Sequence, residues 1–251
     1  MLYYFLKTSF PDLQLDKSPE LSFAELHEVL VENLSEKHFA LYREFLFYID
    51  LQNLRSFIVQ APIDPRGFFS KQELQEALLF REGFPEYVFV FLDRFEETKD
   101  RLAHFTQLYI SFYQKKKEGF LGAYFSHLRQ MRWVLAALRA KSKGKNLLPE
   151  LQFEEEEDRL IAYIIAQKDA AQFEPPPEFS RLKEVFCQHE TDPLLLEKAL
   201  LAYQIDAIEE LEEGKPFEID QVLAFAIKLF LIESWHLLDK ERGKEALKRI
   251  V

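Results

Sequence analysis

Glycine and cysteine are both scarce in this chain of 251 residues. It contains 7 glycines, where ordinary usage of about 7% would give roughly 18. Few positions can therefore take the positive φ that many tight turns need, which argues against a many-stranded β protein and favours long helices. The single cysteine, Cys187, excludes a disulfide within the chain and fits a reducing compartment.

Basic residues are outnumbered by acidic ones, and long apolar runs are also lacking. The chain has 32 Lys and Arg against 43 Asp and Glu, a net charge of −11, so phosphate backbones and anionic lipid surfaces repel it as a whole and nucleic acid is a poor candidate partner. The longest apolar stretch, residues 222–232, contains Lys228 and is about half the roughly 20 residues that cross a bilayer. The apolar start lacks a basic region and a cleavage site. We expect a soluble cytoplasmic protein with no transmembrane segment of its own.

Aromatic residues are abundant, with 25 Phe and 10 Tyr, which argues against a disordered chain. Ser22 with Glu25, and Ser70 with Glu73, have the spacing of helix capping boxes. Apolar residues recur at helical spacing after each of them. These patterns predict an all-α fold. Residues 87–91 could form a buried strand, but we favour a helix there, and a further helix is predicted over residues 154–172.

Three helical units are expected along the chain, at residues 1–67, 68–174 and 175–251. The last boundary is placed at three consecutive prolines, residues 175–177. Such a run takes the extended polyproline conformation and separates helices.

A short polar pattern recurs on three of the predicted helices. Its first two polar members are three residues apart, so they are neighbours on one helix face, whereas the arginine points elsewhere. The copies start at irregular intervals, so a true repeat and a chance match between amphipathic helices both stay open. The residues are Asp50, Asn53 and Arg55 in the first copy, His127, Gln130 and Arg132 in the second, and Glu233 and His236 in the third.

Motifs for catalysis or for binding cofactors and metals are not recognisable. The six histidines have no zinc-site spacing, and the acidic run at residues 154–158 points around all sides of a helix instead of converging on a metal. Neither a P-loop nor a dinucleotide-binding glycine pattern occurs. We expect no catalytic, cofactor-binding or metal-binding residues, although a helical enzyme with a site assembled from distant residues stays an alternative.

Basic residues cluster at Lys141, Lys143 and Lys145. Such a cluster usually marks a solvated helix end, and a partner-binding patch is the alternative.

Several segments resemble the C subunit of V/A-type rotary ATPases, called subunit d in eukaryotes. Residues 50–55, Asp-Leu-Gln-Asn-Leu-Arg, are similar to the acidic residue and Asn-Leu-Arg of its helical repeats, and residues 138–144 to the basic element that follows. Residues 217–225 and the positions that follow to Lys244 resemble its final helix, and residues 3–6 its aromatic start. More specifically, the chain resembles a shortened bacterial family associated with V-type ATPase subunits.

The chain departs from the usual C subunit in being shorter, with His127 in place of the acid and Leu238 in place of an arginine. The resemblance implies irregular helical repeats in a funnel-like bundle, reduced from the usual three domains. It implies a non-catalytic role, in which the protein seats the central stalk on the membrane ring of proteolipid subunits so that rotation and ion translocation stay coupled.

The implied partners are central-stalk subunits and the proteolipid ring, reached from the cytoplasmic face as a peripheral part of the complex. A freestanding helical adaptor with another protein partner is the alternative. In both cases we interpret Asp50, Asn53 and Arg55 as internal braces that fix helix packing through charge-assisted hydrogen bonds.

Overall fold

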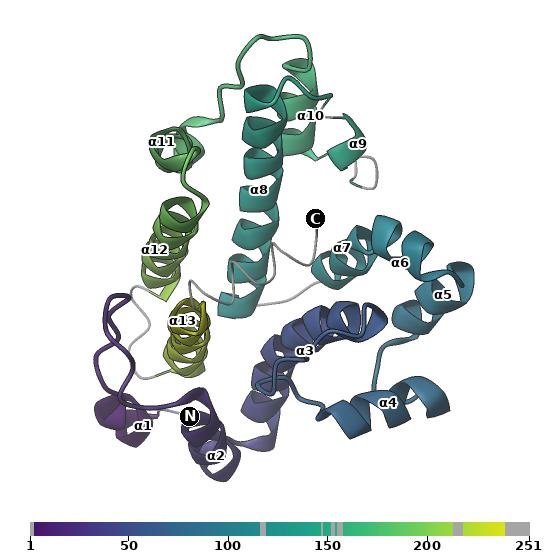
Figure 1. The fold of residues 1–251 in the computed structure, drawn as a ribbon. Helices are drawn as coiled ribbons and strands as arrows, with labels where there is room; N and C mark the ends of the chain where they lie inside the picture. The colour runs from purple at the N-terminus through teal and green to yellow at the C-terminus, as the bar shows by residue number, and fades with distance from the viewer. Residues whose placement is uncertain are drawn as a thin grey trace. The chain divides into compact units, whose positions relative to one another are not determined.

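The computed structural model describes residues 3–115, 119–146, 148–151, 154, 158–212 and 218–238. Within these residues the only regular secondary structure is helical, so the predicted all-α fold is confirmed (Figure 1). The aromatic run at residues 87–91 lies in helix α5 (Glu86–Arg94), as favoured from the sequence. No helix in these ranges is long and apolar enough to cross a membrane.

Two compact units account for the described chain, and each combines segments that are far apart in sequence. One contains Met1–His38, Gly119–Tyr124 and Ser180–Val251, and the other contains Phe39–Glu118 and Phe125–Phe179. The division into three consecutive units stays a prediction from the sequence.

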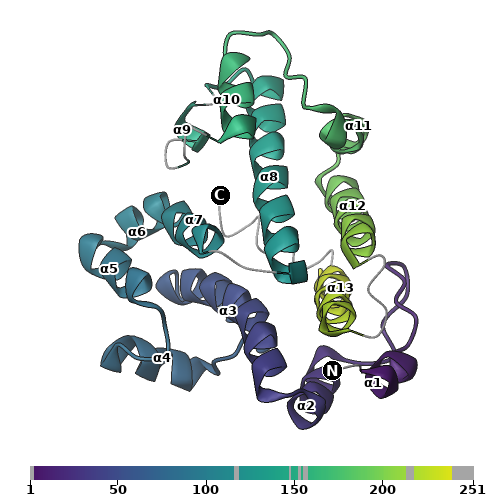
Figure 2. The same ribbon diagram turned by 180° about the vertical axis from the view of Figure 1, so that it is seen from behind.

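The first unit is organised around α13 (Ile219–Leu237), whose residues 222–232 are buried apart from Lys228. The ring of Phe225 stacks on Phe10 at 4.1 Å between centroids, and Phe230 meets the edge of Phe23 at 6.0 Å. Both views show α13 beside α12 (Figures 1 and 2). The other helices of this unit are α1 (Tyr4–Ser9), α2 (Phe23–Asn33), α11 (Ser180–His189) and α12 (Pro193–Glu212).

Lys228 interrupts the apolar run of α13 without being buried as an isolated charge. Its ammonium lies 3.4 Å from carboxylate oxygens of both Glu209 and Glu212, which belong to α12. The long aliphatic stem can therefore pack against apolar neighbours while the charged end reaches paired groups.

The second unit has an aromatic core between α7 (Thr106–Gln114) and the parts of α3 (Glu36–Ile58) and α8 (Gly119–Ser142) that follow His38 and Tyr124. Tyr48 of α3 is its centre, because its ring contacts those of Tyr109, Phe112, Tyr113 and Phe125. Aromatic pairs of this kind contribute about 0.5–1.5 kcal/mol each beyond the area they bury. The remaining helices here are α4 (Lys71–Phe80), α5, α6 (Thr98–His104), α9 (Leu148–Leu151), α10 (Arg159–Ala166) and the 3-10 turn η1 (Pro177–Phe179).

Helix ends follow the local sequence where capping is local. Both predicted capping boxes are present, with Ser22 and Ser70 accepting the N–H groups of Glu25 and Glu73. The helix predicted over residues 154–172 was too long, because α10 covers only Arg159–Ala166. Beyond it, Lys141 donates hydrogen bonds to the carbonyls of Lys168 and Ala170, so tertiary contacts replace helical ones there. Residues 155–157 of the acidic run lie outside the described residues.

Candidate functional site

Asp50 and Asn53 lie one turn apart on α3 and are almost completely buried, with 0% and 1% of their surfaces exposed. They are the only fully buried polar or charged residues in the part of the chain that the structure describes. A buried carboxylate or amide is costly unless its polar atoms are hydrogen-bonded. Their partners therefore identify what the pair does.

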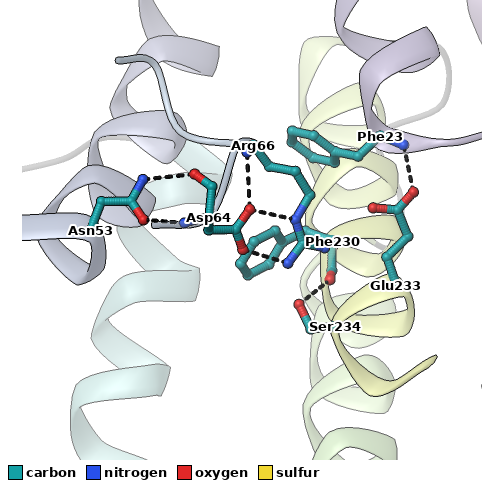
Figure 3. Close-up of polar contacts among 7 residues, drawn as sticks. All are labelled: Phe23, Asn53, Asp64, Arg66, Phe230, Glu233 and Ser234. Atoms are coloured by element: carbon teal, nitrogen blue, oxygen red, sulfur yellow. Dashed lines mark hydrogen bonds and ion pairs between the residues drawn. The ribbon is translucent and has the colours of Figure 1, made fainter. Parts of the chain in front are cut away.

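Asn53 binds the backbone of Asp64, in the segment that connects α3 to α4. Its amide nitrogen donates to the Asp64 carbonyl at 2.9 Å, and its amide oxygen accepts from the Asp64 N–H at 2.7 Å (Figure 3). The Asp64 carboxylate in turn accepts hydrogen bonds from the backbone N–H and the guanidinium of Arg66. Burial works to raise the pKa of Asp64, but the bonds and charge of Arg66 outweigh it and lower that pKa.

Asp50 binds the same connecting segment a few residues further on. One of its carboxylate oxygens accepts from the N–H of Phe68 at 3.1 Å, and the other from the N–H of Phe69 at 3.2 Å. Burial raises the pKa of Asp50 to about 7, although the two backbone hydrogen bonds and Asn53 act to lower it. We call Asp50, Asn53 and the backbone of residues 64–69 the α3 brace.

Gly67 lets the connecting segment approach Asp50 closely. A Cβ atom at this position would lie 2.3 Å from a carboxylate oxygen of Asp50 and 2.7 Å from the amide nitrogen of Asn53. Real Cβ atoms essentially never come so close to another atom. The brace therefore requires glycine here for space.

A cavity of about 330 Å³ adjoins the brace, and Asp50 is one of its lining residues. Aromatic rings dominate its wall, and two cations lie over them: the guanidinium of Arg43 is 4.5 Å from the centre of the Phe68 ring, and the ammonium of Lys115 is 5.1 Å from that of Tyr87. Because both Asp50 oxygens already bind backbone N–H groups, the carboxylate is placed to hold the segment. We find no group of three metal-ligating side chains among the described residues.

The second copy of the polar pattern lies on α8 and makes ring contacts. His127 stacks on Phe179 with centroids 6.1 Å apart. Arg132 lies over the rings of Tyr109 and Tyr113, at 5.7 and 5.9 Å. Gln130 lies in the wall of a hollow that Phe179 also lines.

The third copy, on α13, includes a carboxylate that binds backbone. Glu233 accepts the N–H of Phe23 at 2.7 Å, at the first residue of α2 (Figure 3). The first N–H groups of a helix point out of its hydrogen-bond ladder, and a negative charge is favourable at a helix N-terminus. His236 is exposed, as is Arg55 of the first copy. A true repeat and a chance match between amphipathic helices both stay open as interpretations of the three copies.

The three lysines of the basic cluster have different surroundings. Lys141 is half-buried and its ammonium donates to two carbonyls, at 2.5 and 2.6 Å, whereas Lys143 and Lys145 are exposed. The residues that sequence reasoning missed at the brace are Asp64, Arg66 and Gly67. Residues 64–67, Asp-Pro-Arg-Gly, have the composition of a turn, but nothing local indicates that this turn folds back onto α3.

A family model described as "Protein of unknown function (DUF2764)" matches residues 1–251. A protein of Chlamydia pneumoniae is 30% identical, covering 99% of this chain and 97% of its own length. Proteins of Chlamydia muridarum and Chlamydia trachomatis are 27% and 26% identical, covering 98% and 97% of this chain and 96% and 95% of their own. Each of the three is described as an uncharacterised protein. No solved structure matches the chain.

Replacing Asp50 with alanine should destabilise the fold, because the backbone N–H groups of Phe68 and Phe69 lose their acceptors. We expect the free energy of unfolding in urea to fall by about 2–4 kcal/mol. Arg55→Ala, an exposed change on the same helix, is the control and should stay within about 0.5 kcal/mol of the unaltered protein. Equal effects of the two substitutions would contradict the brace.

Gly67→Ala should also be destabilising, because the new methyl group would overlap the Asp50 carboxylate. The loss should be about 1–3 kcal/mol, and it should shrink when Asp50 is already alanine, since most of the overlap is then removed. A double-mutant cycle by urea denaturation measures this coupling. Strictly additive effects would show that the two residues do not meet.

The raised pKa of Asp50 predicts a specific pH dependence of stability. The carboxyl group titrates at about 7 in the folded chain and at about 3.9 when unfolded, so the folded state holds the proton more tightly. This contribution is complete below the unfolded pKa and is lost as the pH rises through about 7.

We therefore expect the free energy of unfolding of the unaltered protein, relative to Asp50→Asn, to fall by on the order of 2 kcal/mol from pH 5 to pH 8. His27 and His38 also have shifted pKa values, lowered mainly by burial. They are present in both proteins and cancel in the difference. A difference that is constant, or that grows with pH, is incompatible with a raised pKa.

Proposed function

This chain belongs to the family described as protein of unknown function (DUF2764), and we propose that it is a non-catalytic coupling subunit of a V/A-type ATPase. In this role it seats the central stalk on the membrane ring of proteolipid subunits, at the cytoplasmic face, so that rotation and ion translocation stay coupled. Its binding partners are the stalk subunits and the ring. No catalytic residue is assigned to it.

The observation that carries this proposal concerns the polar residues on which the resemblance to the C subunit depends. In the structure they bind the backbone of other segments. Asp50 and Asn53 bind the backbone that leads into α4, and Glu233 binds the first residue of α2. Glu233 thus binds the first residue of a helix, and Asp50 binds the backbone just before the N-cap of another. A part that transmits torque needs its helices held firmly against one another, and hydrogen bonds between carboxyl oxygens and backbone N–H groups supply that.

Charge supports the same kind of partner. The chain carries a net charge of −11, which favours encounter with basic surfaces on stalk subunits or on the ring loops. Interactions between complementary charged surfaces mainly raise the association rate and set the orientation of the partners. Binding should therefore slow as salt concentration rises.

Reconstitution tests the coupling role. The ATPase of the source organism, assembled in vesicles with and without this chain, should hydrolyse ATP in both cases but drive ion uptake efficiently only when the chain is present. Adding the Arg55→Ala variant to vesicles that lack the chain should restore ion uptake. The Asp50→Ala variant should restore less uptake, because its fold is weakened. Ion uptake that is identical without the chain would contradict the proposal.

Co-purification provides the binding arm of the same test. Co-expressed with the central-stalk subunits, the chain should elute with them in size-exclusion chromatography at micromolar concentration. A chain that stays separate from the stalk subunits and from the solubilised ring, while binding other proteins, would instead favour the adaptor role.

A further inference from the structure

A second cavity in the same unit is unusually basic for so acidic a protein. It measures about 320 Å³ and lies beside the C-terminal half of α8 and the loop that follows. This volume is within the range of small-molecule sites. The cationic residues that line it are Arg132, Arg139, Lys143 and Lys145.

Only one carboxylate, Glu154, lines this cavity among the residues that the structure describes. Its side chain is already engaged: one oxygen lies 2.6 Å from a terminal guanidinium nitrogen of Arg129 and 3.2 Å from its Nε. The charge of Glu154 is therefore matched by a cation from outside the lining. Among the lining residues that the structure describes, cations therefore outnumber carboxylates four to one.

Trp133 carries an unsatisfied buried donor and belongs to the lining of the cavity. The residue lines the cavity and is only 3% exposed, and its indole nitrogen is buried with no hydrogen-bond partner in the described part of the chain. An unsatisfied buried N–H costs about 1–3 kcal/mol. Because this nitrogen has almost no accessible surface, an acceptor bound in the cavity would satisfy it only after neighbouring side chains move aside.

We infer that this cavity binds a small soluble oxyanion with several negative charges, of the polyphosphate or phosphate-ester class. Guanidinium and indole N–H groups donate directed hydrogen bonds to phosphate oxygens, and the lysines add mobile positive charge. The net charge of the whole protein opposes anion binding, so recognition depends on these local donors. The site is separate from the α3 brace, and its ligand does not depend on the coupling role.

Tryptophan fluorescence of the full chain can report binding directly. The chain has two tryptophans, so Trp235→Phe leaves Trp133 as the only one. Titration with pyrophosphate should change its emission saturably, with a dissociation constant below about 1 mM. Sodium chloride at matched ionic strength should produce no saturable change. No response to pyrophosphate, or an equal response to chloride, would overturn the inference.

Paired charge substitutions separate the cavity from general electrostatics. Arg139 and Lys143 are exposed at the cavity, so changing both to glutamine should leave the fold intact and weaken pyrophosphate binding by at least about tenfold. Lys37→Gln with Lys99→Gln removes the same charge at exposed positions elsewhere and should change affinity by less than about twofold. Equal losses in the two double variants would refute a specific site.

Calorimetry of Trp133→Phe tests the indole donor separately. Phenylalanine keeps an aromatic ring but lacks the N–H, so pyrophosphate affinity should fall several-fold while the circular dichroism spectrum stays unchanged. Unchanged affinity in a folded variant would remove Trp133 from the site and, with it, the second line of support.

Discussion

The hydrogen-bonding requirement of two buried polar side chains determines the structure of the second unit around α3. Asp50 and Asn53 are removed from water, so each must find partners inside the protein. The backbone of residues 64–69 supplies them, and this fixes the path of the chain immediately before α4. Ser70, the N-cap of α4, follows directly. The position of that helix, and of the aromatic cavity wall at Phe68, thus depends on a polar contact.

Much of this arrangement could be predicted from the sequence, because it depends on local patterns. Scarce glycine, the capping boxes and helical periodicity indicated the all-α fold, and the spacing of Asp50 and Asn53 placed them on one helix face. The partners of that pair could not be predicted, since they come from a loop that returns to α3 after the helix ends. The importance of Gly67 could not be predicted either, because it depends on how closely Asp50 and Asn53 of another segment approach this residue. A turn signature does not reveal that approach.

Tertiary contacts also determine what each lysine of the basic cluster binds or lines. Three lysines close together in sequence indicated a solvated helix end, with a partner-binding patch as the alternative. In the structure Lys141 donates to backbone carbonyls, while Lys143 and Lys145 line a cavity. Arg132 and Arg139 join them there from α8. Long cationic side chains have many conformations, so sequence proximity alone does not determine which of them converge.

The Asp50 carboxylate should hold the backbone of Phe68 and Phe69 in solution as it does in the structure. Hydrogen exchange at these two amides tests this most directly, because neither residue lies in a helix whose own bonds would slow exchange. We expect both amides to be protected nearly as strongly as the buried turns of α3, so that they exchange only when the unit opens. Exchange at the rate of an exposed loop would show that the brace does not hold.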